Sequence, residues 1–417
     1  MVYFAHDYLM KKEHRMAQVQ PDIEAFARIR VVGVGGSGKN AVNHMVESKV
    51  RGVDFISINT DAQDLHHSLA KKKIHIGKNL TRGLGAGMNP DIGRRAAEET
   101  KEEVQQSLKG SDMVFIAGGM GGGTGTGVAP VVAKTAKELG ALTVAVVTKP
   151  FAFEGQQRSR LAEQGLEELR REVDALIVIP NDRILATVAK DTTLKAAFAA
   201  CDDVLKQAVE GISDLITHPG IINVDFADVR AVMENSGSAL MGIGIASGEN
   251  RAAVAAKAAV SSPLLEISIN GAKGVLFAIA GQDDLGMIEV HEAAKIITES
   301  VDPNAKIIFG AIKDEKLKKG EVRVTVIATG FPAAGIAPRG TPLFTFSGRE
   351  TKEVDVPPIG KIFNTPTAAP KEKEPVKEEE AKKPVVEPVA EPKLKKEEDE
   401  EDEWGAVPSF LRRPKIK

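Results

Sequence analysis

Residues 121–127 read Gly-Gly-Gly-Thr-Gly-Thr-Gly and follow the apolar run Met113–Ala117. Glycine at five of these seven positions gives up side-chain packing and carries a large conformational entropy cost. In return, the segment exposes successive backbone N–H groups that can close around a phosphate, and its threonines add hydroxyl donors. The apolar stretch 128–133 then begins a helix whose positive end would face the same anion. A strand, a glycine loop and a helix in this order predict a phosphate-binding turn.

The chain from Arg28 to about Pro180 alternates apolar runs with segments of helical period. Most of the runs are continuously apolar, which is typical of strands in a parallel sheet covered on both faces. This alternation predicts an α/β fold with a doubly wound parallel sheet and ligand loops at the carboxyl ends of the strands. The predicted strands are Ile29–Val34, Phe55–Asn59, Asp112–Ala117, Leu142–Val147 and Ala175–Ile179.

The 417 residues are enough for two domains and a tail. Apolar residues at three- and four-residue steps between Leu194 and Leu215 predict a long central helix. A smaller α/β second domain follows, with predicted strands Ala239–Ala246, Gly274–Ala280, Ala305–Ala311 and Val322–Ala328. The predicted divisions are an N-terminal extension (1–27), a nucleotide-binding domain (28–192), the central helix (193–220), the second domain (221–335), a disordered acidic linker (336–403) and a C-terminal peptide (404–417).

The end of the chain changes composition twice. Residues 371–403 carry more acidic than basic side chains, with prolines and few apolar groups, so they cannot bury a core. The last fourteen residues combine apolar groups such as Trp404 and Phe410 with Arg412 and Arg413. An apolar, basic cluster after an acidic linker is typical of a short partner-binding peptide.

The whole-chain composition excludes several classes of protein. A net charge of −3 does not suggest nucleic-acid binding. The single cysteine, Cys201, excludes an internal disulfide and fits a reducing cytoplasm. No apolar stretch reaches the roughly 18–20 residues that span a bilayer. We therefore expect a cytoplasmic protein with no membrane span.

A first glycine segment, Gly33–Gly38, fits two other kinds of nucleotide-binding protein. It matches the GxGxxG pattern of dinucleotide-binding dehydrogenases. It also nearly matches a P-loop, except that Asn40 stands where a serine or threonine would hold magnesium. Neither class explains the richer glycine segment at 121–127, whereas two phosphate-binding turns on neighbouring strands suit a nucleoside triphosphate.

The 121–127 sequence resembles the signature of the tubulin/FtsZ family, which includes tubulins and a bacterial cell-division GTPase. Other segments resemble the same family in the same order, and together they cover about residues 28–330. These segments are Asn59–Gln63, Gly83–Gly87, Thr148–Gly155, Asn223–Arg230 and Ser261–Leu265. The resemblance implies that the chain binds GTP and GDP, hydrolyses GTP and polymerises into filaments. Mg²⁺ is expected to accompany the nucleotide, with no dedicated cluster of metal ligands in the protein.

The resemblance also implies a role for individual residues. The first glycine segment would hold the proximal phosphates and the second the distal ones, with 86–87 near the γ-phosphate. Glu154 and Arg158 would contact the ribose, Asn181 and Asp202 the edge of the guanine base, and Phe198 its face. The implied nucleotide-binding residues are Gly36, Ser37, Gly38, Lys39, Asn40, Ala86, Gly87, Gly122, Gly123, Thr124, Gly125, Glu154, Arg158, Asn181, Phe198 and Asp202. Lys39 departs from the small residue common in the family, and we expect its side chain to point to solvent.

The acidic loop Asn223–Asp228 is the other implied half of the active site, with Asn223, Asp225 and Asp228 as candidate catalytic residues. At about 1.5 Å per helical residue, the segment from Asp202 to Thr217 carries the chain roughly 23 Å away from the base. These carboxylates would therefore act on a neighbour's nucleotide, by orienting or deprotonating the attacking water. A contact of this head-to-tail kind does not close, so it generates a filament.

We therefore expect a GTPase that assembles into the contractile ring at the bacterial division site, at mid-cell. The partners would be other copies of the chain and, through 404–417, membrane-adaptor and regulatory division proteins. Three alternatives remain at this stage: a metabolic dehydrogenase, a non-catalytic polymer that only binds nucleotide, and a eukaryotic-type tubulin. The short second domain and the tail peptide disfavour the last.

Overall fold

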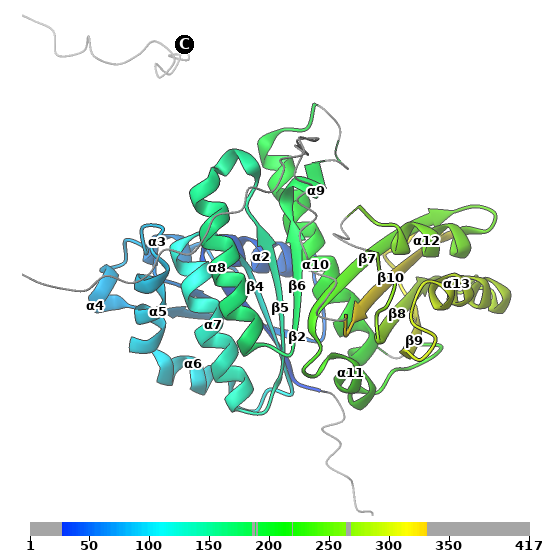
Figure 1. Ribbon diagram of the computed structural model, residues 1–417, viewed down its shortest axis with the longest axis horizontal. Coiled ribbons are helices and arrows are strands. Elements are labelled where there is room, and N and C mark those ends of the chain that lie inside the picture. The colour runs from blue at the N-terminus through cyan, green and yellow to red at the C-terminus, as the bar shows by residue number, and fades with distance from the viewer. Residues whose placement is uncertain (1–26, 186–187, 189–190, 219, 264–267, 332–417) are drawn as a thin grey trace, which may run out of the picture. The chain divides into compact units, whose positions relative to one another are not determined.

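The computed structural model describes residues 27–331, apart from 186–187, 189–190, 219 and 264–267 (Figure 1). The predicted acidic linker and C-terminal peptide lie outside the described residues, as does the predicted N-terminal extension except for Ala27. Among the described residues, no helix has the length and hydropathy to cross a bilayer.

The elements alternate between strand and helix as the sequence predicts. The strands are β1 (Ile29–Val34), β2 (Val53–Asn59), β3 (Lys72–His75), β4 (Met113–Gly119), β5 (Leu142–Lys149), β6 (Ala175–Pro180), β7 (Gly237–Ser247), β8 (Gly274–Gly281), β9 (Lys306–Lys313) and β10 (Glu321–Thr329). The α-helices are α2 (Gly35–Glu47), α3 (Ala62–His66), α4 (Lys78–Thr81), α5 (Pro90–Glu99), α6 (Lys101–Leu108), α7 (Gly123–Glu138), α8 (Gln156–Glu172), α9 (Asn181–Leu185), α10 (Leu194–Thr217), α11 (Phe226–Met233), α12 (Arg251–Val260) and α13 (Met287–Glu299). A short 3₁₀ turn, Ala152–Glu154, precedes α8.

All the strands belong to one ten-stranded sheet in the order β3-β2-β1-β4-β5-β6-β7-β10-β8-β9. The strands from β3 to β6 are parallel, and β7 joins them by a short parallel pairing with β6. β10 pairs antiparallel with β7 and with β8, and β8 is parallel to β9. The chain order reverses between β1 and β4, so their carboxyl ends form the switch point where open α/β sheets bind ligands.

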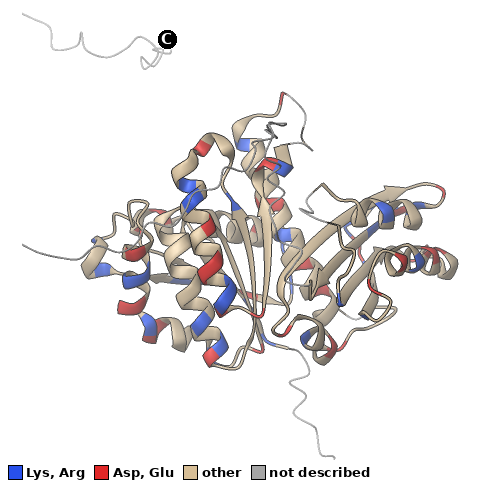
Figure 2. Ribbon diagram, in the orientation of Figure 1, with Lys and Arg blue, Asp and Glu red and all other residues tan. Residues whose placement is uncertain are grey.

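Helices cover both faces of the parallel part of the sheet. One core joins residues of α2 and α10 to one face, and a second core joins α5, α6, α7 and α8 to the other. Adjacent residues of one strand divide between them, with Val31 in the first core and Val32 in the second. The charged side chains lie mostly on the helices and loops, while the central strands carry few (Figure 2). Burial on both faces explains why the strands read as continuous apolar runs.

Helix α10 connects the two parts of the sheet. Its Ile212 and Leu215 share a core with Val144 of the parallel part and with Met241 and Leu276 of β7 and β8. This helix therefore packs on both parts and fixes where its two ends lie.

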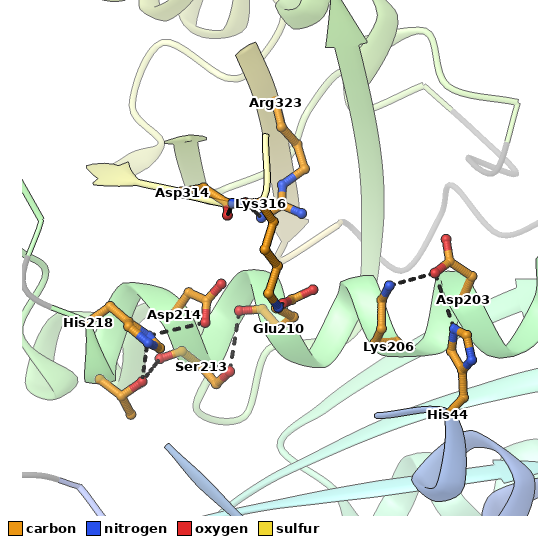
Figure 3. Close-up of polar contacts among 11 residues, drawn as sticks. His44, Asp203, Lys206, Glu210, Ser213, Asp214, His218, Asp314, Lys316 and Arg323 are labelled. Carbon is orange, nitrogen blue, oxygen red and sulfur yellow. Dashed lines mark hydrogen bonds and ion pairs between the residues drawn. The ribbon is translucent and has the colours of Figure 1, made fainter. Parts of the chain in front are cut away.

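Polar contacts hold α10 in the same place (Figure 3). Lys316 Nζ, in the segment after β9, donates to Glu210 Oε1 at 2.6 Å, and Glu210 is only 4% exposed. Toward its N-terminal half, Asp203 Oδ1 lies 3.3 Å from Nε2 of His44 on α2. This ion pair ties the helix to the β9–β10 segment, because removing Lys316 would leave the buried Glu210 carboxylate without its cationic partner.

Every strand predicted from the sequence is present, with ends shifted by at most a few residues. The central helix was predicted at 193–220 and runs from Leu194 to Thr217. The sequence analysis missed β3, an edge strand of four residues in which only Ile74 is buried. A strand this short and polar has no apolar period for a sequence to display.

Candidate functional site

Two helix N-termini lie side by side at the switch point of the sheet. α2 begins at Gly35, directly after β1, and α7 begins at Gly123, shortly after β4. β1 and β4 are hydrogen-bonded neighbours, with Val34 opposite Gly118. Neither helix has an acidic residue in its first turn or a side chain capping its N-terminus. Both positive helix ends are thus left to an anion, as the two glycine segments predict.

A cavity of about 540 Å³ opens at these helix ends, within the usual range for small-ligand sites. Residues from widely separated parts of the chain line it, so it exists only in the folded protein. The predicted nucleotide-binding residues in its wall are Gly36, Ser37, Asn40, Ala86, Gly87, Gly122, Gly123, Thr124, Gly125, Glu154, Arg158, Asn181, Phe198 and Asp202.

Gly38, also predicted to bind nucleotide, does not line the cavity and packs inside the fold. A Cβ atom at this position would lie 2.4 Å from the carbonyl oxygen of Ala117 on β4 and 2.8 Å from the carbonyl carbon of Gly33 on β1. Glycine is required here so that α2 can approach the sheet closely, which is a packing role.

The expectation that Lys39 points to solvent is wrong. Its side chain is buried, and Nζ donates to Asp64 Oδ1 at 2.6 Å. Lys39 does not line the cavity, whereas Asp64 does. The prediction failed because the carboxylate that draws the ammonium inward lies on α3, and nothing in the linear sequence connects the two positions.

The sequence analysis assigned no role to a polar wall that follows β2. Asn59, Asp61 and Asp64 line the cavity there. Asp61 caps α3 by accepting from the backbone N–H of Asp64 at 2.9 Å. The hydroxyls of Thr60 and Thr124 lie 2.7 Å apart, which ties this wall to the second glycine segment. A usable signal existed: polar residues directly after a strand that neighbours β1 must reach the same edge of the sheet.

Three predicted base-binding residues gather at the other end of the cavity. Asn181 begins α9 and is 5% exposed, and within the described part of the chain its Oδ1 has no hydrogen-bond partner. Phe198 on α10 is 41% exposed and makes an edge contact with Phe151. A buried oxygen without a partner carries a free-energy penalty that a bound donor would remove. The N1–H and N2–H₂ groups of guanine are donors of this kind.

Asp202, one turn after Phe198, completes this end. Burial raises the pKa of Asp202 to about 6, and the nearby cations His44 and Lys39 oppose the rise. The carboxyl group is therefore mostly ionised at neutral pH and offers acceptors to the cavity.

The Glu154 carboxylate, also in the cavity wall, is held from two sides. One of its oxygens pairs with the Arg158 guanidinium one turn later, and the other accepts from the backbone N–H of Phe151 at 3.0 Å. Glu154 is thereby fixed in position without a bound ligand, which suits a residue that orients one.

The predicted catalytic residues lie apart from the cavity, and none of them lines it. Asp225 caps α11 by accepting from the N–H of Ala227 at 3.1 Å, and Asp228 follows in the first turn. Asn223 Oδ1 accepts from the N–H of Gly220 at 2.6 Å and so braces the loop. All three side chains are exposed. The predicted arrangement is therefore present, while the catalytic role stays a prediction.

Comparison with known proteins identifies the family. The sequence model of the tubulin/FtsZ family, GTPase domain, matches residues 28–189, and that of the FtsZ family, C-terminal domain, matches residues 237–332. A solved FtsZ dimer from M. jannaschii is 47% identical, aligns over 79% of this chain and 91% of its own, and has a TM-score of 0.70. A point mutant of FtsZ from the same organism is also 47% identical, over 79% and 95%, with a TM-score of 0.71. This chain belongs to the FtsZ family.

Membership of the FtsZ family makes the protein a GTPase. The dehydrogenase and P-loop interpretations of Gly33–Gly38 are therefore wrong. More distantly, CetZ2 from Haloferax volcanii, solved as a GTPγS-bound protofilament, shares the fold at 21% identity over 72% of this chain and 92% of its own, with a TM-score of 0.63.

Adjacent glycines of the second segment should respond differently to substitution. A Cβ at Gly122 would meet nothing within 4 Å, and its φ of −90° suits any residue, so Gly122→Val should fold normally and project into the cavity. A Cβ at Gly123 would lie 2.8 Å from both the Ala86 Cβ and the backbone nitrogen of Asn89. We expect both variants to lose GDP binding, and only Gly123→Val to unfold at a clearly lower temperature. Wild-type GDP affinity in Gly122→Val would show that the cavity is not the nucleotide site.

The affinity for guanine nucleotides should fall as the pH is lowered, because only the ionised Asp202 carboxylate offers two acceptor oxygens to the N1–H and N2–H₂ groups of the base. With a pKa of about 6, lowering the pH from 7.5 to 5.5 should weaken GDP binding about fourfold beyond any effect of the nucleotide's own titration. Asp202→Asn should bind more weakly at every pH and lack this extra dependence. Calorimetric titrations of the wild type and Asp202→Asn with GDP at each pH would measure this dependence. A ratio of the two dissociation constants that is constant with pH would contradict the assignment.

Proposed function

We propose that this FtsZ-family protein binds GTP in the cavity, polymerises head to tail, and hydrolyses GTP at a site shared by two neighbouring subunits. The observation that carries the proposal is that the two halves of the site lie at opposite ends of α10. Phe198 and Asp202, near the start of this helix, line the cavity, whereas Asn223, Asp225 and Asp228 come after its end.

Helix length supports a site shared by two subunits over a site within one subunit. From Asp202 to the last residue of α10 the helix rises roughly 23 Å, at about 1.5 Å per residue. Attack on a phosphate requires the water and its activating group within hydrogen-bond distance, about 3 Å. Asp225 and Asp228 do not line the cavity of their own subunit, and both are exposed, which supports action on a neighbour's nucleotide.

The same geometry favours a filament. A contact between the acidic loop of one subunit and the cavity of the next uses two different surfaces, so every added subunit exposes the same pair again. The solved dimer of FtsZ from M. jannaschii supports self-association, and the CetZ2 protofilament supports repetition along one axis in this fold.

The residues then have distinct roles in the proposed site. The N-termini of α2 and α7 bind the phosphates, Glu154 and Arg158 orient the ribose, and Asn181 and Asp202 read the guanine edge. Asp225 and Asp228 of the neighbour orient or deprotonate the attacking water. Asn223, whose Oδ1 already accepts from Gly220, offers its amide hydrogens to the nucleotide of the next subunit.

Mg²⁺ is proposed to enter with the nucleotide. The hard oxygen donors of Asn59 and Asp61 in the cavity wall suit this ion. The described residues contain no group of three or more histidine, cysteine or acidic side chains arranged to hold a metal, so nucleotide and water oxygens would supply most ligands. The ion would neutralise phosphate charge.

At the cellular level we propose assembly into the cytoplasmic ring at the mid-cell division site. Family membership supports a role in division. The peptide 404–417, outside the described residues, would dock on membrane-adaptor and regulatory proteins through Trp404, Phe410 and the basic residues that follow. Many tails along one filament would bind with avidity. A bacterial source remains a prediction.

GTP turnover should depend on protein concentration and on the acidic loop in trans. The rate per molecule of wild-type protein should be near zero when dilute and rise above a threshold. Asp228→Ala should bind GDP normally and lose about 10²-fold or more in turnover, which is typical for loss of a group acting in proton transfer. Adding it to wild type should lower activity more than dilution does, because each variant subunit inactivates a neighbour's site.

A matched control is Glu234→Gln, which changes an exposed acid at the other end of α11. It should leave both the threshold and the turnover unchanged. A wild-type rate per molecule that is independent of concentration would rule out the shared site. Loss of GDP binding in Asp228→Ala would mean that Asp228 contributes to nucleotide binding in its own subunit, against the proposal.

Deleting 404–417 should leave GTP turnover near wild type and abolish recruitment to the division site. Trp404 is the only tryptophan, so its emission reports on this peptide alone. It should be that of a solvent-exposed indole in the free protein, remain so during GTP-driven assembly, and shift to the blue when an adaptor binds. Normal localisation of the truncated protein would show that attachment uses another surface.

A further inference from the structure

The Asp64 carboxylate occupies a position where a negative charge should oppose phosphate binding. Asp64 lines the cavity, and a Cβ added at Gly36 would lie 3.6 Å from its Oδ2. The carboxylate therefore stands beside the first glycine segment, at the N-terminus of α2. Phosphate groups and a fixed carboxylate at one helix end repel each other, and the cavity wall screens this repulsion less than bulk water does.

A buried cation compensates this carboxylate from behind. Lys39 Nζ donates to Asp64 Oδ1 at 2.6 Å, while Asn59 Nδ2 donates to Oδ2 at 2.8 Å. Lys39 is 8% exposed and absent from the cavity wall, so it does not reach the ligand itself. Its charge nonetheless lies one ion-pair distance behind the wall, close enough to cancel most of the field of Asp64 in the cavity.

We propose that Lys39 and Asp64 form a charge-compensating pair that sets how strongly the cavity retains phosphate charge, and with it the preference for GTP over GDP. The inference rests on the proposed binding of guanine nucleotide in this cavity. It assigns neither residue to the chemical step. Lys39 acts by compensating the charge of Asp64, and the pair acts on the ligand's phosphates through its electrostatic field.

A purely structural role for the pair makes a different prediction. Lys39 is on α2 and Asp64 on α3, so the ion pair also joins two elements that border the cavity. If joining these elements were the pair's only function, breaking the pair would weaken the binding of every ligand by the same factor. A field acts in proportion to ligand charge, so guanosine, GDP and GTP distinguish the two roles.

Three variants separate the charges. Lys39→Met removes the cation at similar volume and leaves Asp64 uncompensated. At pH 8, well above the pKa of Asp202, GTP should then bind about tenfold more weakly, GDP less so, and guanosine unchanged. Asp64→Asn keeps an acceptor for Asn59 and leaves Lys39 uncompensated, so GTP should bind more tightly than in wild type. The double variant should return GTP affinity to near the wild-type value. This reversal of sign is the signature of the proposal.

The matched control breaks a comparable ion pair elsewhere. Lys137 on α7 pairs with the buried Asp174 at 3.1 Å, and neither residue lines the cavity. Lys137→Met should leave the affinities for all three ligands in their wild-type ratio.

Dissociation constants would be measured by calorimetry for guanosine, GDP and GTP, below the assembly threshold and with magnesium chelated to prevent hydrolysis. A second series in 0.5 M salt should show smaller differences among the variants, because salt screens the field. Equal weakening of all three ligands by Lys39→Met, or weaker GTP binding by Asp64→Asn, would overturn the proposal while leaving the nucleotide site intact. Failure of the wild type to bind any of the three would instead overturn the assignment of the cavity.

Discussion

The parallel pairing of β1 with β4 is the constraint on which the site depends. It places two strand-to-helix turns next to each other, and in each turn glycine replaces the side chains that would fill the space. Because the chain order reverses between these strands, α2 and α7 pack on opposite faces and leave a gap between their N-termini. Two uncapped helix ends then point at one volume. Each turn offers one positive helix end, and the pair offers two to the same anion.

Helix α10 adds a second constraint, because its rise per residue fixes the distance between its two ends. Its first turns contribute Phe198 and Asp202 to the cavity, and its far end delivers the acidic loop. Contacts with both parts of the sheet, and the ion pair between the buried Glu210 and the exposed Lys316, fix it along its length. Nucleotide binding is therefore a property of one chain, whereas hydrolysis in the proposed scheme is a property of two. In that scheme, coupling of turnover to assembly follows from the length of this helix.

The sequence predicted what depends on local pattern and missed what depends on distant pairs. Apolar runs located every strand except β3, whose short polar edge carries no period. The glycine segments predicted which loops bind the phosphates, because a run of glycines exposes backbone N–H groups and can be recognised in the sequence itself. The base-binding roles of Asn181 and Asp202 were predicted only from the family resemblance. From the sequence alone, a carboxylate on a helix such as that of Asp202 is expected to be a solvent-exposed residue. Lys39 was misplaced because its partner is 25 residues away and only the pairing of α2 with α3 brings it close.

The charges in the cavity wall also give the ligand a direction. At one end, two helix N-termini attract anions, and the one carboxylate beside Gly36 is balanced by Lys39. At the other end, Asp202 and the Asn181 oxygen, which has no hydrogen-bond partner among the described residues, present acceptors and repel phosphate. A nucleotide entering in the reverse orientation would set phosphates against carboxylate and base donors against helix N–H groups, and both contacts are unfavourable. In the proposed scheme, the polarity of the cavity therefore favours an orientation with the phosphates at the helix N-termini and the base beside Asn181 and Asp202.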